Sequence, residues 1–151
     1  MSEEYFHVSR DDLKIGSILE AKYGQIIQDS RYFMFNDLNY SQYLKEMIIE
    51  EERVQSFPKI PSRLKCIYVV DSIELAKKYL KEFNKEFIYR VKITDGIIHK
   101  VDMKWMDYNR QSLENIREIA RRYFSGQTIG QDTFIECLVE GTVVIENKIY
   151  I

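Results

Sequence analysis

Hydrophobic and polar positions alternate over several short segments of the chain and follow a helical period over others. Runs rich in β-branched and aromatic residues predict strands over 5–9, 64–70, 87–94, 97–101, 134–139 and 142–151. Apolar residues that recur every three or four positions predict helices over 40–54, 73–83 and 113–124. Strands at both ends of the chain with helices between them indicate an α+β fold, built as one domain of residues 1–151.

Short polar signals divide these elements. Asp95-Gly96 predicts a two-residue hairpin between the third and fourth strands. Gly141 is a predicted hinge between the last two strands, and Asp71 or Ser72 can cap the second helix. The aromatic-rich segment 25–37 has no clear period, so it is expected to be strand or packed loop.

The first helix has a candidate buried face and a charged end. Tyr40, Leu44, Met47 and Ile48 fall on one side at helical spacing. The run 50–53, which contains three glutamates and an arginine, is expected to be its solvated end.

Composition narrows the class of protein. The chain is 45% hydrophobic and 30% charged, as in an ordinary globular protein. Its 22 basic and 24 acidic residues leave a net charge of −2, which argues against a protein held on a phosphate backbone. Cys66 and Cys137 lie in apolar runs, which favours free core thiols. The acidic start and the lack of an apolar run of about 18 residues predict a protein without a membrane partner, either cytoplasmic or a toxin exported without a cleaved signal.

The order of a few polar and aromatic residues is more informative than any single motif. No phosphate-binding loop, catalytic triad or metal-ligand spacing is present. His7 and His99 each lie in a predicted strand, where a histidine is usually structural. However, His7 precedes a strand with Tyr68, a helix with Tyr79 and a late strand that opens with Glu136.

Three blocks with this order resemble the His-Tyr-Glu branch of the ADP-ribosyltransferases, which includes the diphtheria-type toxins and the poly(ADP-ribose) polymerases. The small rifampicin ADP-ribosyltransferases are similar in length and share the first two blocks. The middle of the chain shows no resemblance to the family. The blocks are Phe6-His7-Val8-Ser9-Arg10 with Gly16-Ser17-Ile18-Leu19, Ile67-Tyr68-Val69-Val70 with Ala76 and Tyr79, and Glu136-Cys137-Leu138-Val139-Glu140 with Val144.

The resemblance implies a fold and an activity. The fold would be an ADP-ribosyltransferase-like α+β domain, with a split mixed or antiparallel β core and flanking helices. The activity would be that of an NAD-dependent mono-ADP-ribosyltransferase, a bacterial or phage toxin or effector, acting on an unidentified protein, nucleic acid or small molecule. Hydrolysis of NAD by water is a variant of the same chemistry.

The resemblance also assigns roles to five side chains. Glu136 would stabilise the positive charge that develops on the ribose when nicotinamide leaves. Tyr68 and Tyr79 would stack the nicotinamide ring between them. His7 would hydrogen-bond a ribose hydroxyl, and Ser9 would bind the carboxamide.

One position departs from the family, and others are possible additions to the site. Val8 stands where the family has a glycine, which narrows the approach to nicotinamide. Arg10 is a candidate phosphate contact. The loop 125–133 is expected to face the acceptor, with Gln127 and Gln131 as polar contacts.

Each of these residues also has a simpler interpretation. Glu136 can be a solvated strand residue with Glu140 as the alternative carboxylate, and the tyrosines can be ordinary core. Trp105 and Tyr108 either cover the cleft or anchor the core. The chain as a whole can be a non-catalytic NAD-binding module or a protein-interaction domain, and an oligomer is compatible with either. Convergence of His7, Tyr68 and Glu136 on one cleft would favour an NAD site over an unrelated interaction domain.

Overall fold

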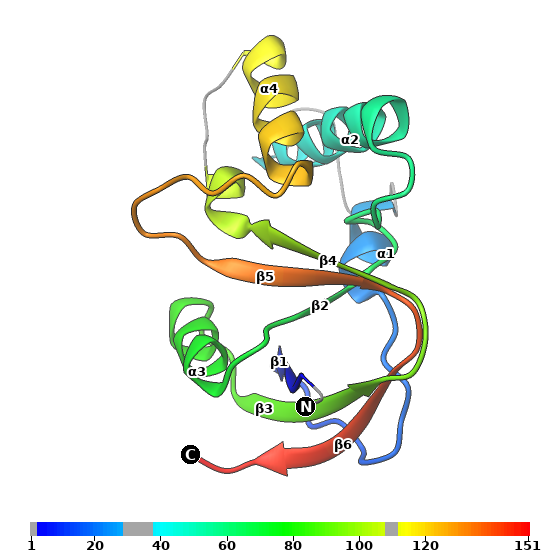
Figure 1. Cartoon of the computed structure of the whole chain (residues 1–151), viewed down its shortest axis with the longest axis vertical. Coiled ribbons are helices and arrows are strands. Elements are labelled where there is room, and N and C mark those ends of the chain that lie inside the picture. Colours follow the sequence, from blue (N-terminus) through cyan, green and yellow to red (C-terminus); the bar gives the residue numbers. More distant parts are fainter. Residues whose placement is uncertain (1–2, 29–37, 108–111) are drawn as a thin grey trace.

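The strands divide between two three-stranded antiparallel sheets, as the computed structural model shows for residues 3–28, 38–107 and 112–151 (Figure 1). The first sheet has the order β1-β3-β6, with β1 Tyr5–Ser9, β3 Phe87–Ile93 and β6 Val143–Ile149. The second has the order β2-β5-β4, with β2 Ile67–Val69, β5 Ile135–Glu140 and β4 Ile97–Asp102. These sheets and the helices around them confirm the predicted α+β class.

The helices flank the two sheets. Figure 1 shows α2 and α4 together beyond the second sheet, and α3 beside β1 and β3. The Ser72 side chain caps α3 by accepting from the Leu75 amide at 3.1 Å, as the sequence pattern allowed. The helices are α1 Lys22–Gln28, α2 Leu38–Ser56, α3 Ile73–Glu82 and α4 Leu113–Phe124, with a 3-10 helix at Met103–Asp107.

The hairpin predicted at Asp95-Gly96 is wrong. β3 pairs with β1 and β6, whereas β4 pairs with β5, so the two strands lie in different sheets. Together β3–β4 and β5–β6 form a long two-stranded ribbon that bends sharply between the sheets (Figure 1). The bend needs the left-handed Gly96 (φ 103°) as a hairpin would, and the Asp95 carboxylate accepts from the Thr142 amide at 2.8 Å. The opposite bend lies at Gly141, as predicted.

Replacing Gly96 by alanine should destabilise the fold by about 2 kcal/mol, because two penalties combine. The backbone angle disfavours a side chain, and the new Cβ would lie 2.0 Å from the Glu140 carbonyl oxygen. Gly16 is a matched control, since its φ is also positive (88°) but no atom lies within 4 Å of the added Cβ. Urea unfolding should show a smaller loss for Gly16→Ala, about 1 kcal/mol. Equal losses would contradict the predicted clash.

Two local predictions differ from the structure. Part of the segment expected to be strand or loop is α1, and its remainder, 29–37, lies outside the described residues. Gly24, just before this segment, lowers the helix propensity of α1, and its missing Cβ would lie 1.5 Å from the Leu64 carbonyl oxygen. β2 is also shorter than expected, because residues 63–65 form a turn closed by a 3.1 Å bond from the Lys65 amide to the Ser62 carbonyl.

Besides the bent ribbon, a bridge between β1 and the end of β2 joins the two sheets. The Phe6 and Val70 backbones exchange hydrogen bonds of 2.8 and 2.9 Å, which places β1 next to β2. Apolar side chains fill the space between the sheets, and a second core lies under α2 and α4. Cys66 and Cys137 are both free and buried, as expected. No helix in the described ranges has the length and apolar character that a membrane crossing requires, and the cytoplasmic location stays a prediction.

Candidate functional site

A cavity of about 680 Å³ opens where β1 and β2 meet. Its walls come from both of these strands, α1, α3, the start of β5 and the 3-10 helix. All five residues singled out in the sequence line it: His7, Ser9, Tyr68, Tyr79 and Glu136. The structure therefore brings together side chains that are up to 129 positions apart in the chain, and His7, Tyr68 and Glu136 meet the condition of a shared cleft.

His7 is fixed in one tautomer. Its Nδ1 lies 2.9 Å from the Tyr68 carbonyl oxygen, which can only accept, so Nδ1 carries the proton. Burial lowers the pKa of His7, and the charges of Lys85 and Lys22 lower it further. The ring is consequently neutral near pH 7. Its Nε2 is left as a hydrogen-bond acceptor, which is the role that a ribose hydroxyl requires.

Glu136 is a buried carboxylic acid. It lies near the start of β5, opposite Val101 of β4, and only 3% of its surface is exposed. Within the described part of the chain its carboxylate has no hydrogen-bond or ion-pair partner. Burial raises the pKa of Glu136 to about 7, and the charge of Arg63 opposes this rise. The solvated alternative is therefore wrong. Glu140 is the exposed one and does not line the cavity.

The two tyrosines reach the cavity from different elements. Tyr68 on β2 donates its hydroxyl to the Arg63 carbonyl at 2.8 Å and contacts the Tyr23 ring edge-on at 6.0 Å. Tyr79 on α3 packs against Phe83, with ring centres 4.5 Å apart. Burial raises the pKa of Tyr79, and the charge of Glu136 raises it further. Both rings are partly buried and line the cavity, so core packing and ligand contact are compatible for them.

The end of β1 contributes two further polar groups. The Ser9 hydroxyl oxygen accepts from the Asp11 amide at 3.0 Å, which leaves its own proton for a ligand. Arg10 lines the cavity, and its Nη2 donates to the Phe83 carbonyl at 3.3 Å. Val8, which the resemblance predicts to narrow the approach to nicotinamide, also lines the cavity.

Sequence reasoning missed the arginine at the inner wall of the cavity. Arg63 is buried and binds Glu46 of α2, with Nη2 3.0 Å from Oε1, while its Nη1 donates to the Tyr123 hydroxyl at 2.8 Å. Its guanidinium lies 5.3–5.7 Å from the ring centres of Tyr23, Tyr68 and Tyr123. No distinct signal in the sequence marks this arginine, because it follows two prolines in a segment that also contains other polar residues, Lys59, Ser62 and Lys65.

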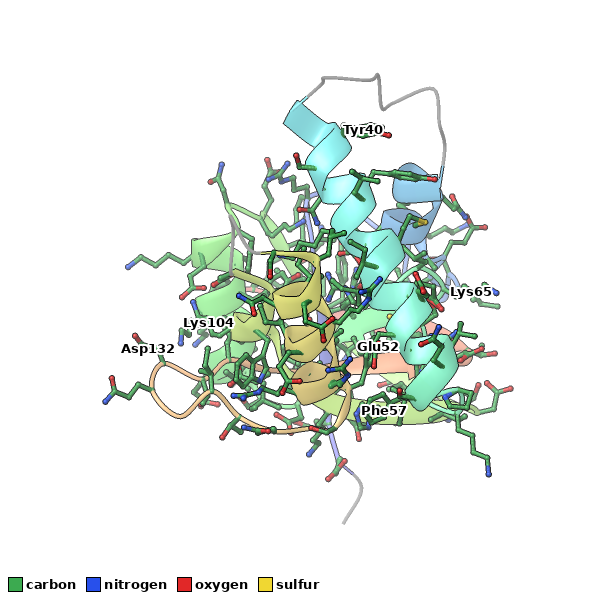
Figure 2. All side chains as sticks on the ribbon, turned by 90° about the horizontal axis from the view of Figure 1, so that it is seen from above. Tyr40, Glu52, Phe57, Lys65, Lys104 and Asp132 are labelled. Atoms are coloured by element: carbon green, nitrogen blue, oxygen red, sulfur yellow. The ribbon has the colours of Figure 1, made fainter. Side chains whose placement is uncertain are left out.

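The buried face of α2 also differs from the predicted one. Glu46, Ile49 and Glu52 are buried, whereas Leu44 is 43% exposed. Figure 2 shows Glu52 between α2 and α4, where its carboxylate binds Arg121 of α4 at 2.8 Å. The predicted solvated end of this helix is therefore wrong for Glu52. An ion pair makes its burial possible, although the hydrophobic period of the helix predicts an exposed carboxylate at this position.

Comparison with known proteins assigns the chain to a family. A family model described as a protein of unknown function, DUF2441, matches residues 3–150. The chain belongs to DUF2441. Comparison with curated proteins gives no match. The function of this DUF2441 protein therefore has to be argued from its cavity.

The loop before β5 is anchored in the DUF2441 fold by two side chains. The buried Asp102 carboxylate accepts from the Ile129 and Phe134 amides at 2.9 and 3.0 Å. Trp105 is buried and donates its indole N–H to the Gln127 carbonyl at 2.7 Å. Of the two alternatives for Trp105, covering the cleft or anchoring the core, the structure therefore favours the second. The side chains expected to meet an acceptor, Gln127 and Gln131, do not line the cavity. Tyr108 lies outside the described residues.

The second histidine has a structural role. The His99 Nε2 lies 2.7 Å from the Phe124 carbonyl oxygen at the end of α4, so the ring ties β4 to that helix. His99 does not line the cavity.

Proposed function

We propose that this protein binds NAD in the cavity and breaks its nicotinamide–ribose bond, transferring ADP-ribose to an acceptor that is still to be identified. One observation supports this most. The five side chains that the resemblance selects come from β1, β2, α3 and β5, yet all of them line one cavity. An unrelated interaction domain has no reason to place an acid, a neutral histidine and two tyrosines together.

The chemistry centres on Glu136. When the C–N bond breaks, its electron pair leaves with nicotinamide, and positive charge develops on the ribose. An ionised carboxylate in a buried site stabilises that charge more strongly than one in water. The acceptor then forms a new bond to the ribose carbon and loses its proton. The charge of Arg63 favours the ionised form of Glu136, while the ion pair of Arg63 is made with Glu46.

The remaining side chains would orient the dinucleotide. The Nε2 of His7 accepts a hydrogen bond from a ribose hydroxyl, and Ser9 donates its hydroxyl proton to the carboxamide oxygen. Tyr68 and Tyr79 present aromatic faces to the nicotinamide ring.

A non-catalytic NAD-binding module is the second candidate, and two observations favour it. A pKa of about 7 leaves Glu136 partly protonated at neutral pH, which weakens it as an electrostatic catalyst. Val8 also lines the cavity at the position where ADP-ribosyltransferases have a glycine, and its side chain would narrow the approach to nicotinamide.

Nicotinamide release and NAD binding separate these candidates. We expect the purified protein at pH 8 to bind NAD in a calorimetric titration and to release free nicotinamide, measured by chromatography. Binding should also stabilise the fold by about 2.7 kcal/mol at an NAD concentration 100 times the Kd. Binding without release would favour the non-catalytic module, whereas no binding and no release would contradict both.

A further inference from the structure

We infer that Arg10 and Lys85 form a subsite for a diphosphate ester at the end of the cavity next to His7. The inference rests on the proposed function for the identity of the ligand as NAD. The anion site itself follows from the arrangement of charges in the cavity.

One backbone hydrogen bond and one side-chain hydrogen bond join the segments that carry these cations. Arg10 directly follows β1, and Lys85 lies in the turn between α3 and β3. The Glu86 amide donates to the Ser9 carbonyl at 3.2 Å, and the Arg10 guanidinium donates to the Phe83 carbonyl at 3.3 Å. Both cationic side chains line the cavity.

Neither Arg10 nor Lys85 is part of an ion pair in the described ranges, whereas nearby Lys22 binds Asp11 at 2.8 Å. Lys85 is partly buried, and burial followed by the charge of Arg10 lowers the pKa of Lys85. The charge of Asp11 raises that pKa by less than burial and Arg10 lower it. Arg10 is exposed, and its charge adds to the cost of keeping the partly desolvated Lys85 charged. An anion bound between them would recover that cost.

The order of groups along the cavity indicates which anion fits. The pairing of β5 with β2 places Glu136 beside the bridge that Phe6 makes to the end of β2, so Glu136 lies near the Phe6 end of β1. His7 follows Phe6 along β1, and Arg10 lies just beyond the other end of that strand, hydrogen-bonded to the segment that leads to Lys85. The cavity therefore runs from Glu136 past His7 to the two cations. NAD carries its nicotinamide, ribose and diphosphate in the same order.

The two side chains also suit a diphosphate better than a single carboxylate. A guanidinium binds two oxygens of one phosphate through its fork, and an ammonium adds a compact charge for the second phosphate. The acid at this end, Asp11, is already held by Lys22 and does not oppose the ligand with a free charge.

Calorimetry with four probes tests the subsite: NAD, ADP-ribose, inorganic pyrophosphate, and nicotinamide riboside, which has no phosphate. We expect Lys85→Met and Arg10→Gln each to weaken the first three about tenfold, with a smaller effect at high salt. Nicotinamide riboside should bind as before. Lys77→Met, on the exposed face of α3 and away from the cavity, should change none of them.

A stability measurement gives an independent readout. Lys85→Met should raise the melting temperature of the ligand-free protein, because it removes one of two repelling charges. If Lys85 had a purely structural role, the same substitution would lower the melting temperature.

The outcomes distinguish this inference from the proposed function. Loss of pyrophosphate binding in both variants would support the subsite, whether or not the native protein releases nicotinamide. Absence of nicotinamide release would count against the transferase alone. Unchanged affinities for ADP-ribose and pyrophosphate would overturn the subsite even when NAD is cleaved. Equal weakening of nicotinamide riboside would also overturn it, because the variants would then have altered the cavity itself.

Discussion

The Glu136→Gln variant should release nicotinamide from NAD more slowly than the native protein by a factor on the order of 1000, while its affinity for NAD changes little. Glutamine keeps the shape of the side chain but carries no charge. It therefore removes the stabilisation of the cationic ribose that arises only as the bond breaks. The rate of release at saturating NAD, measured by chromatography, checks this expectation.

The native protein should show a distinctive pH profile. Since the burial of Glu136 raises its pKa to about 7, kcat/KM should increase with pH through a midpoint near 7. An ordinary surface glutamate would give a midpoint near 4.5. The positively charged nicotinamide of bound NAD favours the ionised acid, so the midpoint for kcat should lie lower than that for kcat/KM.

The same carboxyl should make the folded state less stable at high pH. The folded pKa of about 7 lies above the ordinary 4.5, so this contribution is fully present below pH 4.5 and is lost as pH rises through 7. The loss amounts to about 3 kcal/mol. Glu136→Gln removes it, so the variant should gain stability relative to the native protein between pH 5 and pH 8. The comparison cancels the opposite effect of His7, whose lowered pKa destabilises the fold in acid.

Glu140→Gln is the matched control for both measurements. It removes a carboxylate from the same strand, but that carboxylate is exposed and outside the cavity. Its rate and its pH profile should equal those of the native protein. A rate loss of similar size in both variants, or a Glu136→Gln protein that releases nicotinamide at the native rate, would rule out Glu136 as the charge that stabilises the ribose.

Features set by local contacts were predictable from the sequence. The strand 5–9 and the helix 113–124 have the predicted bounds, and Ser72 caps α3. These elements depend on alternation, on neighbours three or four positions apart, or on a cap. The partner of a strand depends on the whole chain instead. This is why the Asp95-Gly96 bend between sheets was mistaken for a hairpin.

The candidate site was predictable only in part, for a related reason. Its five residues were predicted from the order of motifs along the chain, which can be recognised without knowledge of the fold. Arg63 and Glu46 have no such motif, because one lies in a turn and the other among charged residues of a helix. Only their mutual contact makes their burial favourable, and that contact joins positions 17 apart through tertiary structure.

Replacing Arg63 by methionine should reduce the free energy of unfolding at pH 7 by about 4 kcal/mol. The substitution leaves the Glu46 carboxylate, which is 1% exposed, without its cation. It also removes the donor to the Tyr123 hydroxyl and the charge surrounded by three tyrosine rings. The loss should shrink as the pH falls. Without Arg63, burial raises the pKa of Glu46, and protonation then removes the buried charge.

Urea unfolding of the double variant Glu46→Gln, Arg63→Met tests this cause. If the stranded charge is responsible, the second substitution should recover a large part of the loss, although it removes one more native group. Disruption of the exposed Lys22–Asp11 pair, which has a similar length, should have little effect. Losses that simply add would show that Arg63 acts by filling space rather than by neutralising Glu46. In either case the charge of Arg63 lowers the pKa of Glu136, so the pH midpoint for nicotinamide release should move upward in every Arg63 variant that folds.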